Sequence, residues 1–238
     1  MRLDKVIEHQ LHTTRKEMKR LFLMKKVRID GKVERNPQRN VDSQLHDIQV
    51  DDQQLQTNHV YYLLNKPAGV VTAKKDAHFQ TATQLIAEAE RPTDLYPVGR
   101  LDRDTTGLLL LTDNGQLGYD LLQPGLKVEK TYHAVVNERV TQKDVEDFSE
   151  GILFHGGVRC QPAELTILHS EQKESEVLLT IKEGKFHQVK KMFLACGKKV
   201  IRLERISMGP LRLPKDLAAG EYRSLTLKEL KQLKIYFR

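Results

Sequence analysis

Positive charge is concentrated at one end of this 238-residue chain. Residues 1–40 contain 12 Lys and Arg but only 5 Asp and Glu, a net charge of +7, which equals the formal net charge of the whole chain. The remaining residues contain 27 charges of each sign. This distribution favours a fold of two parts, a small basic one and a larger, electrically balanced one. With 39% hydrophobic residues the chain can bury a core, so we expect folded parts and not a disordered chain.

Composition and residue spacing exclude several classes of protein. A helix needs about 18 apolar residues to cross a bilayer, whereas apolar runs such as Leu108–Leu111 reach only four residues, so no membrane segment is expected. The first residues lack the apolar stretch of a signal peptide. The two cysteines, Cys160 and Cys196, lack the paired Cys or His spacing of a disulfide framework or a zinc site. We therefore expect a reduced, cytoplasmic protein without a bound metal.

The basic part carries local signals for two helices and a hairpin. A first helix is predicted by four apolar residues at helical spacing, Leu3, Val6, Ile7 and Leu11. Thr14 and Glu17 have the spacing of a capping box, which predicts the start of a second helix. Val27–Ile29 and Lys32–Val33 flank Asp30-Gly31, a two-residue turn typical of a β-hairpin. We expect a helix pair followed by this hairpin.

The second predicted helix has a basic side, formed by Arg15, Lys16, Lys19 and Arg20. Clustered charges of one sign, followed by a basic hairpin, are the electrostatic pattern of a protein that binds a phosphate backbone. The alternative is an ordinary solvated helix face. Because the whole net charge of the chain lies in this part, we favour a nucleic acid partner. Such contacts give affinity and position but no sequence recognition.

A polar stretch, residues 36–59, separates the basic part from the rest, and we place the domain boundary near residue 58. The second part mixes short β-rich runs with helical patterns. Strands are predicted at 107–112, 131–136 and 177–181, and helices at 81–90, 141–148 and 189–195, the last with Gly197 as its left-handed cap residue. This irregular order predicts an α+β fold with a mixed, largely antiparallel sheet flanked by helices, and not a regular βαβ repeat.

The densest chemistry lies in the segment 99–107, where two carboxylates and two guanidinium groups occupy five positions before an apolar strand. An extended backbone would place Arg100, Asp102 and Asp104 on one face. The alternative is a charged loop whose Asp residues cap turns, and local chemistry does not choose between Asp102 and Asp104. A second cluster, 183–193, is basic and enters a helix; His187 alone is more often structural than catalytic. We find no phosphate-binding Gly-Lys-Ser/Thr loop, metal spacing or nucleophile elbow, so no cofactor is expected.

Taken together, these segments resemble the RsuA-type ribosomal RNA pseudouridine synthases over nearly the whole chain. The motifs that carry the resemblance are Met1–Lys5, Asn65–Gly69, Gly99–Gly107, Lys130–Tyr132, Glu183–Met192 and Lys199–Leu203. The resemblance implies an S4-like RNA-binding domain over residues 1–58 and a pseudouridine synthase catalytic domain over residues 59–238. It also implies an isomerase that moves a ribose from N1 to C5 of uracil without a cofactor.

The resemblance assigns roles that spacing alone leaves open. Asp102 matches the catalytic aspartate, Tyr132 matches the tyrosine that stacks on the target uracil, and Lys190 occupies the place of the basic residue paired with the aspartate, where many relatives carry Arg. Arg100 matches the arginine that fills the space of the flipped nucleotide. Further substrate or RNA contacts are expected from Leu203, His187, Gln188, Arg15, Lys16, Lys19 and Arg20.

Within this family, Phe186–Lys190 and Gly220–Arg223 look more like the small-subunit enzyme, so we expect one uridine of 16S ribosomal RNA, of the uridine 516 type, as the target. Three alternatives remain open: a synthase acting on 23S ribosomal RNA, a non-catalytic S4-like RNA-binding or ribosome-assembly protein, and an N-glycosidase using both carboxylates. Naked RNA and an assembly intermediate are both possible forms of the substrate. Nothing in the sequence requires an obligate protein partner, and we expect a monomer.

Overall fold

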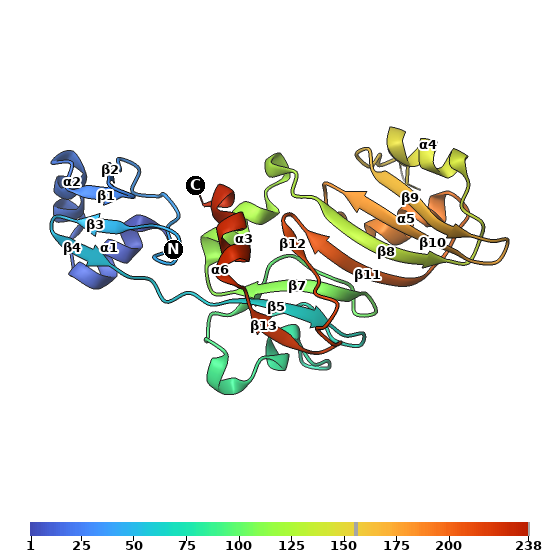
Figure 1. Cartoon of the computed structure of the whole chain (residues 1–238), viewed down its shortest axis with the longest axis horizontal. Coiled ribbons are helices and arrows are strands. Elements are labelled where there is room, and N and C mark those ends of the chain that lie inside the picture. Colours follow the sequence, from blue (N-terminus) through green and yellow to red (C-terminus); the bar gives the residue numbers. More distant parts are fainter. Residues whose placement is uncertain (155–156, 238) are drawn as a thin grey trace.

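A computed structural model of the chain describes residues 1–154 and 157–237, and it contains two separate sheets (Figure 1). The α-helices are α1 (Leu3–Leu11), α2 (Arg15–Leu23), α3 (Gly115–Leu122), α4 (Gln142–Glu150), α5 (Gln188–Ala195) and α6 (Leu227–Gln232). The short 3₁₀ helices are η1 (Ala82–Leu85), η2 (Glu88–Glu90), η3 (Pro124–Leu126) and η4 (Leu233–Tyr236). No helix in these ranges is long and apolar enough to cross a membrane.

The smaller sheet lies in the basic part of the chain. Its strands, in the order β2-β1-β3-β4, are β2 (Lys32–Val33), β1 (Val27–Ile29), β3 (Ile48–Val50) and β4 (Gln53–Leu55). Helix α1 buries Leu3, Val6 and Ile7 against this sheet. Both sides of the predicted capping box form at α2, since Thr14 accepts from Glu17 N–H and the Glu17 carboxylate accepts from Thr14 N–H. The helix pair and the β1–β2 hairpin are confirmed.

The hairpin of β3 and β4 lies in the polar stretch 36–59, where the sequence predicted no strand. Ile48 and Val50 are buried and alternate with Gln49, and Asp51 turns the chain with φ 53°, a left-handed conformation that Asp tolerates better than most residues. The Asp51 carboxylate also pairs with Lys26 at 2.6 Å. Two apolar residues in a polar stretch are too weak a pattern to predict a strand. The strand forms because this segment pairs with β1.

The larger sheet follows the order β13-β5-β7-β11-β8-β10-β9, with β12 beside β11 and β6 beside β7. Its strands are β5 (Tyr61–Lys66), β6 (Tyr96–Pro97), β7 (Thr106–Thr112), β8 (Lys130–Val136), β9 (Glu164–Ser170), β10 (Ser175–Ile181), β11 (Val200–Met208), β12 (Leu211–Arg212) and β13 (Tyr222–Ser224). Every strand pair in the described residues is antiparallel except β7 with β11. The predicted α+β class with a largely antiparallel mixed sheet is confirmed.

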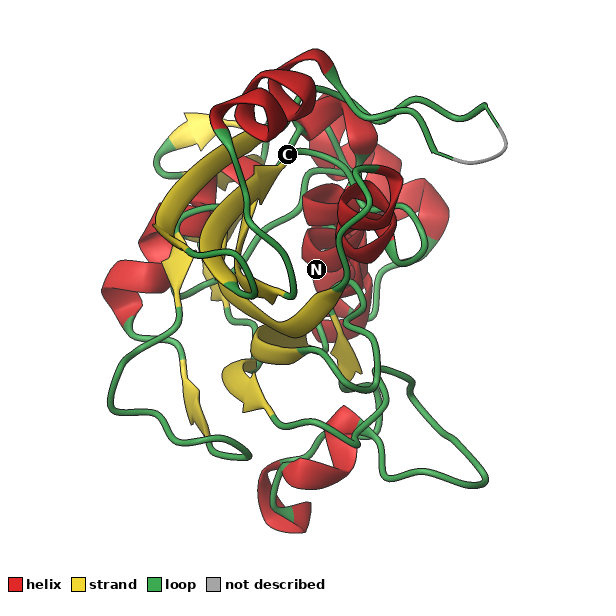
Figure 2. Ribbon diagram, turned by 90° about the vertical axis from the view of Figure 1, so that its right-hand side faces the viewer, coloured by secondary structure: helices red, strands yellow, loops and turns green. Residues whose placement is uncertain are grey.

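Strand β7 is buried on both faces, which explains its run of four leucines. Leu109 and Leu111 face a core that α4 and α5 complete with Phe148, Met192 and Phe193. Leu108 and Leu110 face a second core that α3 and α6 complete with Leu117, Leu121 and Leu230. Figure 2 shows the curvature of the strands and the helices around them. Two cores therefore hold the strand that immediately follows the 99–105 segment.

The prediction of one continuous helix over residues 81–90 is wrong. The segment forms two single turns, η1 and η2, separated by extended backbone at Ile86 and Ala87. This break buries the Ile86 side chain in the core and lets Ala87 N–H donate to the Tyr222 hydroxyl at 3.0 Å. A tertiary hydrogen bond and a buried side chain thus replace the helical continuity that the local pattern suggests.

The two parts of the molecule make specific polar contacts beside the C-terminal helices (Figure 1). The Tyr61 hydroxyl on β5 donates to the buried Asp42 carboxylate at 2.5 Å. Lys234 on η4 pairs with Asp30 at 3.1 Å and donates to the Leu45 carbonyl at 2.8 Å. Strand β4 ends at Leu55 and β5 begins at Tyr61. The domain limit near residue 58 stays a prediction, but the contacts show that the small sheet is fixed against the large one.

Candidate active site

The segment before β7 forms a turn and not the extended strand that would place Arg100, Asp102 and Asp104 on one face. Thr105 N–H donates to the Asp102 carbonyl at 3.1 Å, which closes the turn. Gly107, the second residue of β7, has φ 98°, and a Cβ there would lie 2.4 Å from the Arg205 carbonyl oxygen of β11. Only glycine permits this close approach of β7 and β11. The turn is therefore set by tertiary contacts that the alternation pattern does not contain.

Residues 66–72 hold this loop, defined here as residues 99–105 and called the Asp102 loop. Gly69 N–H donates to the Arg103 carbonyl at 2.8 Å, and the Lys66 ammonium donates to the same carbonyl at 3.3 Å. The Thr72 hydroxyl donates to the Leu101 carbonyl at 2.8 Å and accepts from Leu101 N–H at 3.1 Å. These contacts fix the backbone on both sides of Asp102, and preorganised backbone of this kind positions functional side chains.

Lys66 is a completely buried cation beneath the Asp102 loop. Burial lowers the pKa of its ammonium to about 8, and the nearby charges of Asp104 and Asp102 oppose that shift. It donates to the Pro67 carbonyl at 2.7 Å as well as to Arg103. The motif 65–69 therefore places a positive charge under the two carboxylates, a role that the sequence did not assign to it.

Lys190 brings helix α5 to the Asp102 loop. Its ammonium lies 2.9 Å from Asp102 Oδ2 and 2.6 Å from Asp104 Oδ1. Burial lowers the pKa of Lys190, but the hydrogen bonds to Asp104 and Asp102 outweigh burial and leave that pKa above its usual value. The hydrogen bond from Lys190 likewise lowers the pKa of the Asp104 carboxyl. The structure thus brings together the predicted aspartate and its basic partner.

The two carboxylates of the loop occupy different environments. The Asp102 side chain is 26% exposed and also lies 3.5 Å from His187 Nε2, whereas the Asp104 side chain is 73% exposed. A reacting group needs a position partly shielded from water, where electrostatic interactions are stronger. Asp102 therefore lies in the more shielded position and Asp104 at the rim, and the catalytic role of Asp102 stays a prediction.

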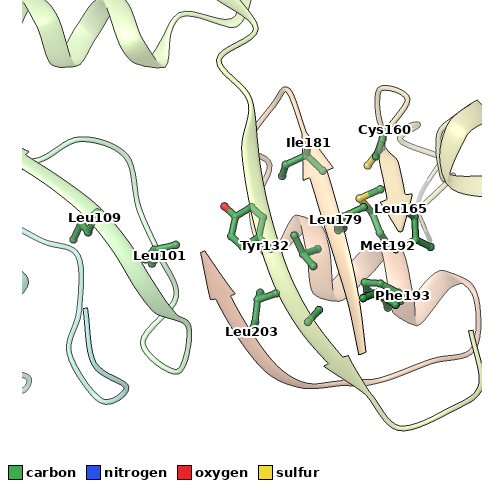
Figure 3. Packing of buried hydrophobic residues seen from close by; sticks show 14 of the residues in the cluster. Leu101, Leu109, Tyr132, Cys160, Leu165, Leu179, Ile181, Met192, Phe193 and Leu203 are labelled. Atoms are coloured by element: carbon green, nitrogen blue, oxygen red, sulfur yellow. The ribbon is translucent and has the colours of Figure 1, made fainter. Parts of the chain in front are cut away.

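Tyr132 and Leu203 lie on the neighbouring strands β8 and β11, and Leu101 of the Asp102 loop lies across from them (Figure 3). All three side chains are buried and belong to one apolar cluster. An aromatic ring beside aliphatic side chains is an apolar environment of the kind that suits the face of a nucleobase. The uracil-binding role of Tyr132 and Leu203 stays a prediction.

The other predicted contacts occupy different places. Arg100 is exposed and lies within the Asp102 loop, two residues before Asp102. Gln188 is buried and holds the chain before α5, since its amide donates to Glu183 at 2.8 Å and accepts from Lys185 N–H at 2.8 Å. The four cations of α2, Arg15, Lys16, Lys19 and Arg20, are all exposed and lie in the small part, far from the Asp102 loop (Figure 1).

Two contributors to the site had no assigned role at the sequence level. Lys66 belongs to a motif already recognised, so its place in that motif is a signal for it. Thr72 had no such signal, because its value depends on a hydroxyl that meets the backbone of Leu101 from 29 residues away. Among residues 1–154 and 157–237, no group of three or more His, Cys, Asp or Glu side chains could hold a metal ion.

A fold and site of this kind correspond to one class of protein. Residues 60–195 match the family model described as RNA pseudouridylate synthase, and the chain therefore belongs to the RNA pseudouridylate synthase family. It is a pseudouridine synthase, an isomerase of RNA uridine, and within the family it is of the RsuA type. The resemblance inferred from the motifs is confirmed.

The full-length relatives support this assignment. An uncharacterised RNA pseudouridine synthase of Bacillus subtilis is 38% identical over 97% of both chains. The ribosomal small subunit pseudouridine synthase A of Vibrio cholerae is 39% identical, covering 97% of this chain and 98% of its own, and that of Escherichia coli is 38% identical with the same coverage. A crystal structure of a pseudouridylate synthase superposes with a TM-score of 0.69 at 36% identity, covering 98% of this chain and 99% of its own.

Proposed function

We propose that this enzyme converts one uridine of small-subunit 16S ribosomal RNA to pseudouridine, at the site of the uridine 516 type, with Asp102 as its catalytic carboxylate. The observation that carries the catalytic assignment is the Asp102–Lys190 pair, 2.9 Å apart, beside the apolar surface of Tyr132 and Leu203. The choice of RNA is supported by relatives named ribosomal small subunit pseudouridine synthase A, which match this chain over nearly their full length.

The reaction is an isomerisation in which atoms are conserved. The C1′–N1 bond breaks, the uracil turns, C1′ joins C5, and the C5 proton leaves while N1 gains one. These steps need a carboxylate in its charged form. A cation 2.9 Å away favours that form, so the carboxylate of Asp102 can serve. Two routes use the same group: attack of Asp102 on the reacting nucleotide, or abstraction of a ribose proton with stabilisation of the charge at C1′.

Tyr132 and Leu203 then hold the uracil while its bond to the ribose is broken. An uracil inside a base stack cannot reach this surface, so the nucleotide must flip out at a cost of a few kcal/mol. Arg100, exposed within the Asp102 loop, can occupy the vacated space in the RNA. Phosphate contacts from the α2 cations offset part of the flipping cost.

Replacing Asp102 with Asn tests the catalytic assignment. The amide keeps the shape of the side chain but not its negative charge, so we expect pseudouridine formation to be abolished while RNA affinity stays near that of the unchanged protein. Pseudouridine is measured by carbodiimide adducts and primer extension on 16S RNA from a strain lacking the gene, after incubation with purified protein. Appreciable turnover by Asp102→Asn would refute the assignment.

The same assay separates the rival substrates. Modification of 23S RNA in place of 16S RNA would contradict the proposed target, and release of free uracil would identify an N-glycosidase, because an isomerase leaves RNA mass unchanged. We further propose a monomer that acts in the cytoplasm. Comparing a naked 16S transcript with a partly assembled small subunit identifies which form of the RNA is modified.

A further inference from the structure

Two phenylalanine side chains near the Asp102 loop are exposed to water. Phe186, just before α5, is 64% exposed, and Phe79, in the segment between residues 66 and 81, is 44% exposed. Burying a Phe side chain is worth about 2–3 kcal/mol, so neither position is explained by packing of the fold. Each residue belongs to one of the two segments that contact the Asp102 loop.

Phe186 is organised by the helix that carries Lys190. Its ring stacks on the ring of His187 with centroids 3.8 Å apart and an angle of 20°. The Lys191 ammonium lies 5.0 Å from the Phe186 ring centroid. In this stacked pair His187 is next to the carboxylate, since its Nε2 lies 3.5 Å from Asp102, and Phe186 is the exposed member.

Phe79 is held by Arg103, the residue that follows Asp102 in the chain. The guanidinium of Arg103, the residue after Asp102, lies 4.5 Å from the Phe79 ring centroid. The Asp76 carboxylate accepts hydrogen bonds from His78 N–H at 2.8 Å and Phe79 N–H at 2.9 Å, which fixes the local backbone. Phe79 is thus held in place while its ring stays exposed.

Both arrangements combine an exposed aromatic ring with an adjacent cation. Unpaired RNA is bound by this combination, because bases stack on aromatic rings and phosphates attract the neighbouring positive charges. A protein partner would call for a larger apolar patch, whereas each of these rings is flanked by charge.

We propose that Phe186 and Phe79 are stacking sites for two bases that flank the target uridine in unpaired RNA, with Lys191 and Arg103 contacting their phosphates. This inference rests on the proposed function, since it presumes that RNA enters at Asp102. The enzyme would then hold the flanking bases on its surface while the uracil lies beside Tyr132 and Leu203.

Binding of two oligoribonucleotides tests the proposal with the full-length protein. The first has the sequence around the 16S target uridine and about ten nucleotides; the second is identical except that the two nucleotides flanking the uridine are abasic. We expect Phe186→Ala and Phe79→Ala each to raise the Kd for the first RNA roughly five- to hundred-fold, and to change the Kd for the abasic RNA less than two-fold. Phe186→Tyr restores binding.

The salt dependence separates stacking from charge. Neither alanine substitution removes a cation, so the slope of log Kd against log salt should stay that of the unchanged protein. Leu168→Ala, at an exposed apolar position on β9, is the matched control and should leave both Kd values unchanged.

Two results would overturn the proposal. Equal losses for both RNAs would show that the phenylalanines only support the local fold, and unchanged binding of both would show that they do not contact bases. The proposed function fails separately, if the unchanged protein forms no pseudouridine in ribosomal RNA.

Discussion

The two basic clusters of this enzyme use the same residue types in opposite ways. On α2, Arg15, Lys16, Lys19 and Arg20 are exposed, and within the described residues none of the four forms an ion pair. Around α5, most cations have acidic partners: Lys182 with Glu129, Lys185 with Glu183, Lys190 with Asp102 and Asp104, and Lys198 with Asp144.

The difference shows that the number of cations does not indicate what a basic cluster does. The unpaired cations of α2 remain available to the phosphates of an RNA. All of the net charge of the chain lies in that part. The paired charges around α5 contribute no excess, and one of them, Lys190, holds the Asp102 carboxylate at 2.9 Å. One cluster is suited to attract RNA and the other to organise a reaction.

Removing the central cation of the α5 cluster should have the largest effect. In Lys190→Met, Asp102 and Asp104 lose their shared counter-charge, so we expect kcat to fall on the order of 10²- to 10³-fold while RNA affinity changes little. Single-turnover kinetics at saturating RNA measure this. Asp104→Asn, at the exposed rim, is the control and should retain most activity. A loss of affinity instead of kcat in Lys190→Met would erase the distinction between the clusters.

Removing the α2 cations should affect binding and not chemistry. With Arg15, Lys16, Lys19 and Arg20 all changed to Gln, the slope of log affinity against log salt should fall by roughly 3, because each phosphate contact contributes about 0.7 to 0.9. The Kd should rise on the order of ten- to hundred-fold at moderate salt, with kcat preserved. An unchanged slope would mean that this helix does not contact RNA. The substitutions avoid deleting the module, whose Asp42 and Asp30 contact the rest of the molecule.

Loosening the Asp102 loop should have an intermediate effect. Thr72→Val keeps the side-chain shape but leaves the N–H and carbonyl of Leu101 without their partner. We expect kcat to fall about ten-fold and the free energy of unfolding to fall by about 1–3 kcal/mol. Chemical denaturation and kinetics measure the two effects. Thr93→Val, at an exposed position, serves as the control. Unchanged kcat would show that the paired charges hold the loop without Thr72.

The smallest expected effect is on the pH dependence of stability. The pKa of Lys190 is raised in the folded state, so its contribution is complete below the unfolded value and is lost as pH rises above about 10.5. The pKa of Asp104 is lowered, so its contribution is present above about 3.8 and is lost as pH falls below that value. Because Asp104 is largely exposed, we expect the stability difference between Asp104→Asn and the unchanged protein to be under about 1 kcal/mol near neutral pH, and to vanish in acid. A difference that persists in acid would exclude the ion pair as its cause.

Local chemistry predicted much of this molecule, and long-range contacts account for the rest. The Thr14–Glu17 capping box and the Asp30-Gly31 turn involve neighbours in sequence, and both formed as expected. The break at Ile86–Ala87 and the turn at Asp102 depend on Tyr222, Lys66 and Gly69, which no local pattern includes.

The site itself was predicted unevenly for the same reason. Motif resemblance paired Asp102 with Lys190, and the structure brings their side chains together. The choice between Asp102 and Asp104 could not come from spacing, because it depends on exposure. Phe186 lies in a motif that the resemblance already used, but the exposure of its ring and that of Phe79 had no sequence signal, because an aromatic residue in a loop is ordinarily expected to pack.

The strand order of the large sheet also sets when activity can appear during synthesis. Every pairing of the small sheet lies within residues 27–55, so that sheet can close soon after it leaves the ribosome. Asp104 and Lys190 are 86 residues apart, and β13 must be made before it can pair with β5. At about 5–20 residues per second, synthesis of the chain between the end of β4 and the end of β13 takes roughly 10–30 seconds. A nascent chain therefore carries a finished basic module before it has a working isomerase site, and enzymatic activity is among the last properties that the growing chain acquires.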